Sequence, residues 1–167
     1  MCEEAEKAMR AMAASMPPLP LLKKLKAYVH HANLRVRAKA AVAISHCAAR
    51  MVGHATRSSC CSVQYISLDI RDSEFRLLAC AQDIEAMKEF GMSALLQVAA
   101  ELLNDRLPEA REAARGVVSS MHAAFSKDAA ASGQEDDAAA SWESLCSLSL
   151  PPISAVAVAK ITASSSS

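Results

Sequence analysis

The chain has 167 residues, with 18 basic and 18 acidic side chains, 52% hydrophobic residues, 4% aromatic residues and 4 glycines. Alanine and serine supply 35 and 21 of the residues. Because alanine is the best helix former and strands prefer aromatic and β-branched residues, this composition favours a single all-α domain over a β-sandwich or barrel. No glycine-rich loop follows a strand-like run, which disfavours a parallel α/β nucleotide-binding fold.

The sequence carries no signal for secretion or membrane insertion. Its first residues, MCEEAEK, are acidic where a secretory signal would be basic and then apolar. No run approaches the roughly 18 apolar residues that cross a bilayer. The six cysteines lack C-x-x-C spacing, which is typical of reduced thiols in a cytosolic protein. We therefore expect a cytoplasmic protein with no membrane partner.

The zero net charge conceals a strong asymmetry. Residues 1–68 contain ten basic and three acidic side chains, whereas residues 69–167 contain eight basic and fifteen acidic ones. A basic half without local counter-charges creates a field that attracts an acidic partner. Alternatively, the acidic half of the chain folds against the basic half.

Apolar periodicity predicts the first helices. Leucines at helical spacing indicate a helix over Leu19–His30, with lysines on its other side. A short break follows, in which Asn33 is suited to cap the next helix. That helix is expected over 34–52, and Gly53 is expected to end it.

The middle of the chain is less regular. The stretch 54–70 fits either a poor helix or a short extended piece. A helix is then expected over Asp72–Phe90, and a strongly helical segment follows over 92–104. The next break ends at Pro108, a residue type that favours the first turn of a helix, and a helix is expected from Pro108 to about Lys127.

The remaining sequence changes in composition. Residues 129–141 are rich in small and acidic residues and poor in branched apolar ones, which predicts a disordered linker. We therefore divide the chain into a helical region over 1–128, this linker, and a tail over 142–167 that contains short helical segments.

Three of the expected helix starts share one pattern, in which a capping residue and an apolar residue precede an arginine, and an alanine lies three positions after it. The capping residues are Asn33, Asp72 and Asp105, and the arginines are Arg37, Arg76 and Arg111, spaced 39 and 35 residues apart. Such a period with helix–turn–helix content is typical of HEAT-type α-solenoids. The arginines are expected to link repeats by pairing with the acidic caps of neighbours. We predict an all-α solenoid of about three helical hairpins, the alternative being a plain helical bundle with coincidental spacing.

Parts of the sequence resemble a known family. The stretch EFGMSALLQVAAELLNDRLPEAREAAR, over 89–115, is similar to the late repeats of TOG domains, the tubulin-binding HEAT arrays of CLASP-type and crescerin-type microtubule regulators. NLRVRAKAAVAISHC, over 33–47, is similar to an earlier second helix of that class, and the tail after 141 resembles the segment that follows such domains in plant members. The resemblance covers about half of the chain and suggests a partial domain.

The resemblance implies where a partner would bind. Family members contact tubulin through the turns inside each repeat, aligned along one edge. The matching positions here are His31, Asn33, Leu34 and Arg35 in the first turn and Arg106, Leu107 and Pro108 in the third, with Lys23, Lys24 and Lys26 on the preceding helix. We thus expect a non-enzymatic microtubule-associated protein of the cytoskeleton whose partners are tubulin and microtubules.

Other functions have weaker support in the sequence. No H-x-x-x-H, G-x-S-x-G or paired-carboxylate pattern occurs, so we expect no enzymatic activity, no metal, no cofactor and no small-molecule substrate. Nucleic-acid binding by the basic half is an alternative on charge, although Tyr28 and Tyr65 are its only aromatic residues and leave no stacking platform. A generic HEAT adaptor for another protein is the second alternative.

Overall fold

The structure is a computed structural model, and it describes residues 4, 7, 8, 11, 12, 15–52, 87–131 and 138–165. Every regular element in these residues is a helix and none is a strand, which confirms the all-α prediction for this part of the chain. The predictions for Gly53, for 54–70 and for Asp72 and Arg76 lie outside the described residues.

The first hairpin consists of α2 (Pro18–Leu25), a single 3₁₀ turn η1 (Lys26–Tyr28), and α3 (Leu34–Met51). The helix expected to reach His30 therefore tightens at its end, which turns Tyr28 outward to 50% exposure. The predicted cap of α3 is confirmed, because the Asn33 side chain accepts a hydrogen bond from the backbone N–H of Arg35 at 2.9 Å.

The second hairpin consists of α5 (Met92–Leu103) and α6 (Pro108–Ala131). Gly91 separates α5 from the helical residues before it and has φ of 98°, a left-handed conformation that favours glycine. Pro108 is the first residue of α6, as the sequence predicts.

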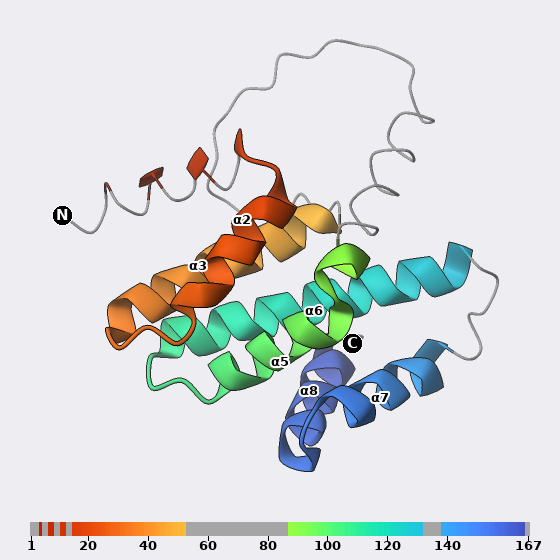
Figure 1. Cartoon of the computed structure of the whole chain (residues 1–167). Helices are drawn as coiled ribbons and strands as arrows, with labels where there is room; N and C mark the ends of the chain where they lie inside the picture. The colour runs from red at the N-terminus through yellow and green to blue at the C-terminus, as the bar shows by residue number, and fades with distance from the viewer. Residues whose placement is uncertain are drawn as a thin grey trace, which may run out of the picture.

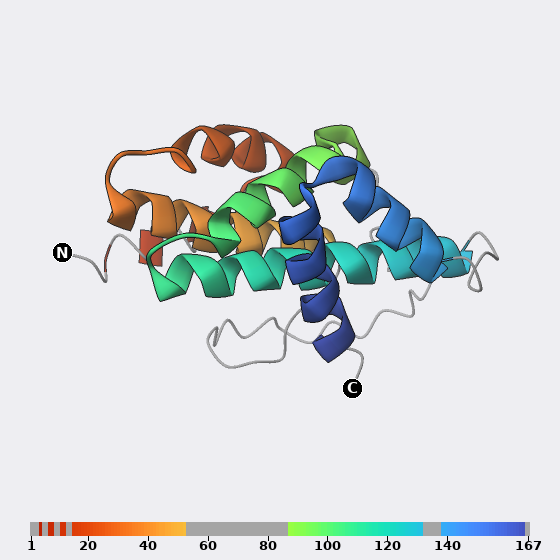
Figure 2. The same ribbon diagram turned by 90° about the horizontal axis from the view of Figure 1, so that it is seen from below.

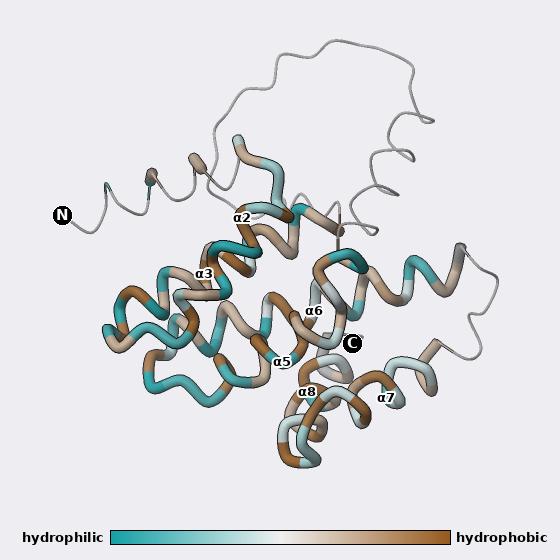
Figure 3. Tube along the Cα trace, in the orientation of Figure 1, coloured by the Kyte–Doolittle hydropathy of each residue, from teal (hydrophilic) through white to brown (hydrophobic). Residues whose placement is uncertain are grey.

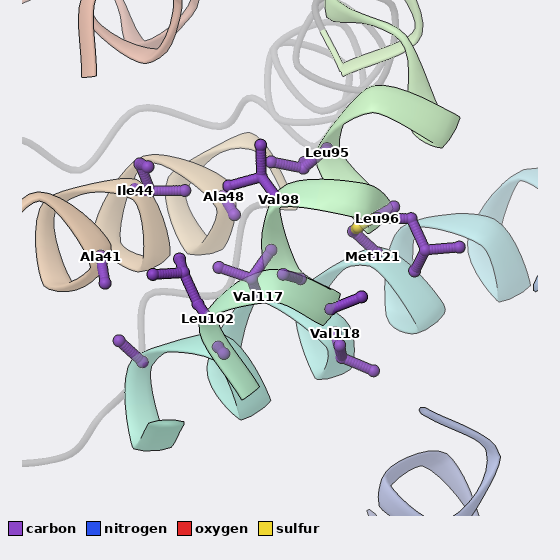
Figure 4. Close-up of a cluster of buried hydrophobic side chains, with 14 of the residues drawn as sticks. Ala41, Ile44, Ala48, Leu95, Leu96, Val98, Leu102, Val117, Val118 and Met121 are labelled. Carbon is purple, nitrogen blue, oxygen red and sulfur yellow. The ribbon is translucent and has the colours of Figure 1, made fainter. Parts of the chain in front are cut away.

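The two hairpins lie side by side, with α3 and α6 parallel (Figure 1). Lys39 at the start of α3 bonds Glu109 at the start of α6, and Lys127 near the end of α6 donates to the carbonyl of Val52 at 2.8 Å. Apolar side chains from α3, α5 and α6 converge between them (Figure 4). The contact is close at one point, where a Cβ added to Gly116 would lie 2.6 Å from the Ser45 hydroxyl oxygen.

The neighbours in space are not neighbours in sequence. A solenoid stacked in chain order would separate α3 from α6 by the repeat predicted around 72–90. Instead α3 packs directly on α6, and apolar residues of both helices, such as Ile44 and Cys47 on α3 and Val118 and Met121 on α6, are buried in one core. The first and third predicted units are therefore in direct contact.

A third hairpin covers the second one. It consists of α7 (Ala138–Ser149) and α8 (Pro152–Ser165); α7 packs on α5 and α6, and α8 crosses α6 (Figure 2). Helix α7 begins four residues before the predicted tail, and α6 ends three residues after the predicted helical region. Both ends of the linker predicted over 129–141 are therefore helical. The part of that linker over 132–137 lies outside the described residues.

Candidate interaction edge at the helix turns

An ion pair joins the two turns that the sequence singled out. The Arg37 side chain, on the first turn of α3, donates from Nε to Asp105 Oδ2 at 2.6 Å, and the two side chains are 24% and 4% exposed. The second carboxylate oxygen accepts the backbone N–H of Leu107 at 2.9 Å. The turn before α3 and the turn before α6 are therefore held at one edge of the molecule (Figure 1). We call residues 30–35 and 104–108 the turn edge.

The structure agrees with the linking role predicted for the arginines and modifies it. Arg37 pairs with Asp105 of the third predicted unit, so this arginine does link two units, although they are not consecutive in the sequence. Arg111 instead holds its own turn, because it donates to the carbonyl oxygens of Asp105 at 2.9 Å and Arg106 at 3.1 Å. Asp105 bonds the N–H of the residue before α6 rather than one inside that helix, so it fixes the turn more than it caps the helix.

Some predicted contact residues shape the turn itself. The backbone N–H of Asn33 donates to His31 Nδ1 at 3.1 Å, while the Asn33 side chain caps α3. Leu107 is half-buried and packs against the core, and Leu34 is also half-buried. His31, Asn33 and Leu107 are therefore structural parts of the turn edge.

Most residues of the turn edge are exposed, among them Arg35, Arg106 and Pro108. The guanidinium groups of Arg35 and Arg106 form no ion pair with any of the described residues. The backbone at the first turns of α3 and α6 adds partial positive charge to the same edge, since the amide groups of a helix N-terminus point outward. This arrangement presents two cationic side chains to a partner.

The lysines of the first helix lie elsewhere. Lys23 bonds Glu89 at 3.1 Å, and Lys26 lies 5.9 Å from the centre of the Phe90 ring. Glu89 and Phe90 precede α5, so they are at the end of that helix opposite its turn. Lys24 is exposed on α2. Of these three lysines, Lys23 and Lys26 therefore do not extend the turn edge as the sequence suggested.

The acidic half of the chain folds against the basic half. Lys39 bonds Glu109 at 2.6 Å and His30 lies 3.6 Å from Glu101, besides the pairs of Arg37 and Lys23 already described. Each of these pairs joins a basic residue before 53 to a carboxylate after 86. Of the two interpretations of the charge asymmetry, this part of the structure supports internal compensation, and it leaves Arg35 and Arg106 as isolated charges.

The sequence analysis missed Tyr28 as a surface residue. Tyr28 falls at helical spacing with Leu21 and Leu25, which predicts an inward side chain, but the 3₁₀ turn rotates it toward solvent. Its ring lies 6.4 Å from that of His31, beside the turn edge. The sequence contains little indication of this turn. Its only sign was that the predicted helix ends at His30, just three residues before the Asn33 cap.

The titratable groups with displaced pKa values are two buried cysteines and the half-buried His122. Burial raises the pKa of the Cys47 thiol to about 11, and burial together with Glu143 raises the pKa of Cys146. Burial lowers the pKa of His122, whose ring meets that of Trp142 edge-on at 5.2 Å. Both thiols are therefore protonated and poor nucleophiles at neutral pH.

Two searches of the described residues gave no further site. They contain no group of three His, Cys, Asp or Glu side chains that could hold a metal ion. None of their helices is both long enough and apolar enough to span a bilayer. Comparisons of the chain with models of protein families, with curated proteins and with solved structures found no match.

Proposed function

We propose that this chain is a non-enzymatic module of the HEAT-type α-solenoid kind, and that it binds tubulin through the turn edge. The observation that carries the proposal is the Arg37–Asp105 ion pair, because it aligns two basic turns from distant parts of the sequence on one edge. The sequence resemblance to TOG domains supplies the identity of the partner. In this proposal the protein is cytoplasmic and associated with microtubules.

The mechanism is non-covalent and electrostatic. Arg35 and Arg106 would face an acidic surface while the stacked helices hold their spacing constant. Exposed ion pairs contribute only about 0.2–1 kcal/mol each, so the two arginines must act together with other contacts. Binding should weaken as salt is added, because exposed charges are screened over about 8 Å at physiological ionic strength.

Internal charge compensation argues against the nucleic-acid alternative. A protein that follows a phosphate backbone needs several uncompensated basic side chains along one path. Here Lys23, Arg37 and Lys39 are each engaged by a carboxylate from the second half of the chain. The remaining free cations of the turn edge are two, which suits a local contact with an acidic protein surface.

The test is co-sedimentation with microtubules of the Arg35→Glu/Arg106→Glu variant. Reversing two charges removes two attractive contacts and adds two repulsive ones, so we expect affinity to fall roughly 10- to 100-fold at low salt. The control is Arg50→Glu/Lys88→Glu, which makes the same change in net charge at exposed residues near the opposite ends of the hairpins. It also removes the exposed Lys88–Asp128 ion pair and the Arg50 hydrogen bond to the Met16 carbonyl, which at exposed positions contribute little to stability. The control should pellet like the wild type, and helicity should be the same in all three proteins. Equal pelleting of the two variants would refute the proposed site.

A further inference from the structure

The corner between α7 and α8 exposes large apolar side chains. Leu148 is 88% exposed, Ile153 is 87% exposed and Val156 is 56% exposed. They lie within nine residues of one another, around the Pro151–Pro152 turn. Among the described residues, no other short segment exposes three large aliphatic side chains. Contiguous apolar surface of this kind marks an interaction site more often than it occurs on a free surface.

The same corner lies at the open end of the stack of hairpins. The first hairpin is covered by the second, and the second is covered by α7 and α8, whose far side faces away from both (Figure 1). Helix α8 is apolar on both of its sides: Val158 is buried, while Ile153 and Val156 face outward. Apolar residues all round a helix are typical of a helix that is covered on both sides. Hydropathy along the trace shows hydrophobic segments gathering where α7 meets α8, in contrast to the hydrophilic turn between α5 and α6 (Figure 3).

Charge at this corner identifies the occupant. No charged residue occurs between Ser144 and Ala159, so the patch offers nothing to a strongly acidic or basic partner. In the sequence this uncharged segment is bounded by Glu143 on α7 and Lys160 on α8, both exposed and neither in an ion pair with a described residue. An uncharged apolar corner that carries an acid on one of its helices and a base on the other suits a second copy of the same surface, because across a two-fold axis each acid can pair with the other copy's base.

We propose that the α7–α8 corner is a homodimer interface between two copies of this chain, with Leu148, Ile153 and Val156 at its centre and Glu143 and Lys160 at its rim. Stable dimers bury about 1,200–2,000 Å² in total, more than three side chains of each copy supply, so the dimer is weak and forms at high concentration. Each dimer carries two turn edges, and two linked sites bind a repetitive partner more tightly than one. This gain in microtubule affinity rests on the proposed function.

Sedimentation equilibrium of the full chain over a wide concentration series tests the interface without any tubulin present. The wild-type mass should rise from one chain toward two, whereas Leu148→Asp/Ile153→Asp should keep the mass of one chain at every concentration. Val36→Asp, a change at an exposed apolar residue in α3, is the matched control and should dimerise like the wild type. If the aspartate variant loses helicity, Leu148→Ser/Ile153→Ser replaces it with the same expected loss of the dimer.

A charge exchange tests the pairing across the two-fold axis. Glu143→Lys should weaken the dimer several-fold because it places like charges opposite each other, and Glu143→Lys/Lys160→Glu should restore it. A wild-type chain that remains monomeric, or a dimer unaffected by the aspartate changes, would overturn the proposal. Binding of the monomer to neutral lipid vesicles, lost in the aspartate variant, would overturn it in favour of a membrane surface. If the wild-type chain dimerises but does not bind microtubules, the result contradicts the function proposed for the turn edge and leaves the dimer interface standing.

Discussion

Replacing Asp105 by alanine should lower the free energy of unfolding substantially, because its carboxylate is the joint between the two hairpins. The group is 4% exposed and accepts two hydrogen bonds, from Arg37 Nε at 2.6 Å and from the Leu107 N–H at 2.9 Å. A hydrogen bond to a charged group contributes about 1.5–3 kcal/mol, and Arg37 at 24% exposure recovers part of its loss from water. We therefore expect Asp105→Ala to cost about 2–4 kcal/mol.

A double-mutant cycle isolates the part of this loss that belongs to the ion pair. The cycle compares Arg37→Met, Asp105→Ala and the double variant. Arg37→Met alone leaves a buried carboxylate without its counter-charge, so it should also be costly. The coupling free energy is expected to be about 1.5–3 kcal/mol, above the 0.2–1 kcal/mol of exposed pairs.

Urea unfolding followed by far-ultraviolet circular dichroism measures each corner of the cycle. The control cycle uses Arg115 and Glu112, which form an ion pair at 3.1 Å within α6 with side chains that are 58% and 75% exposed. That pair should couple by about 0.3–0.5 kcal/mol. A coupling for Arg37 and Asp105 no larger than that of the control would refute the argument that this ion pair holds the turns together.

Three further outcomes follow from the packing. In the Ser45→Ala background, Gly116→Ala should stabilise the protein by about 1 kcal/mol through helix propensity, because the added Cβ then meets only ordinary contacts. Gly116→Leu should instead cost about 1–3 kcal/mol by overpacking. Urea unfolding midpoints measure both changes. Burial lowers the pKa of His122 in the folded chain, so the unfolded chain binds the proton more readily. The free energy of unfolding should therefore be unaffected by this histidine above pH 6.5 and should decline as the pH falls below 6.5. Urea unfolding followed by Trp142 fluorescence should show this decline in the wild type and not in His122→Gln. The Cys47 thiol, with its pKa near 11, should resist iodoacetamide in the native chain and react on unfolding, as peptide mass spectrometry can show; rapid native labelling would contradict its burial.

Local sequence signals predicted the helices well. The Asn33 cap, the start of α6 at Pro108 and the break at position 91 before α5 all depend on neighbouring residues only, and the structure has each of them in place. The end of the first helix and the extent of α7 were predicted less well. Both depend on tertiary packing, which tightens the chain at Lys26 and buries Trp142 against α6.

The arrangement of the site required long-range information. The repeated pattern predicted ion pairs between neighbouring repeats, and the pair that the structure has, Arg37 with Asp105, joins the first and third predicted units. The sequence order, however, suggested that another repeat lies between them, and only the packing of α3 on α6 shows that these units are neighbours. Likewise, Lys23 looked like part of a basic face because its partner, Glu89, is 66 residues away in the sequence.

The binding of the wild-type chain to microtubules across a salt series, measured beside a gel shift with random-sequence RNA, tests the central claim most directly. Our account predicts that the protein pellets with microtubules at low salt, is released as salt is added, and gives no RNA shift. An RNA shift without pelleting would contradict the account and assign the exposed arginines to phosphate binding. The absence of both signals would also contradict it and would favour an adaptor for a different protein.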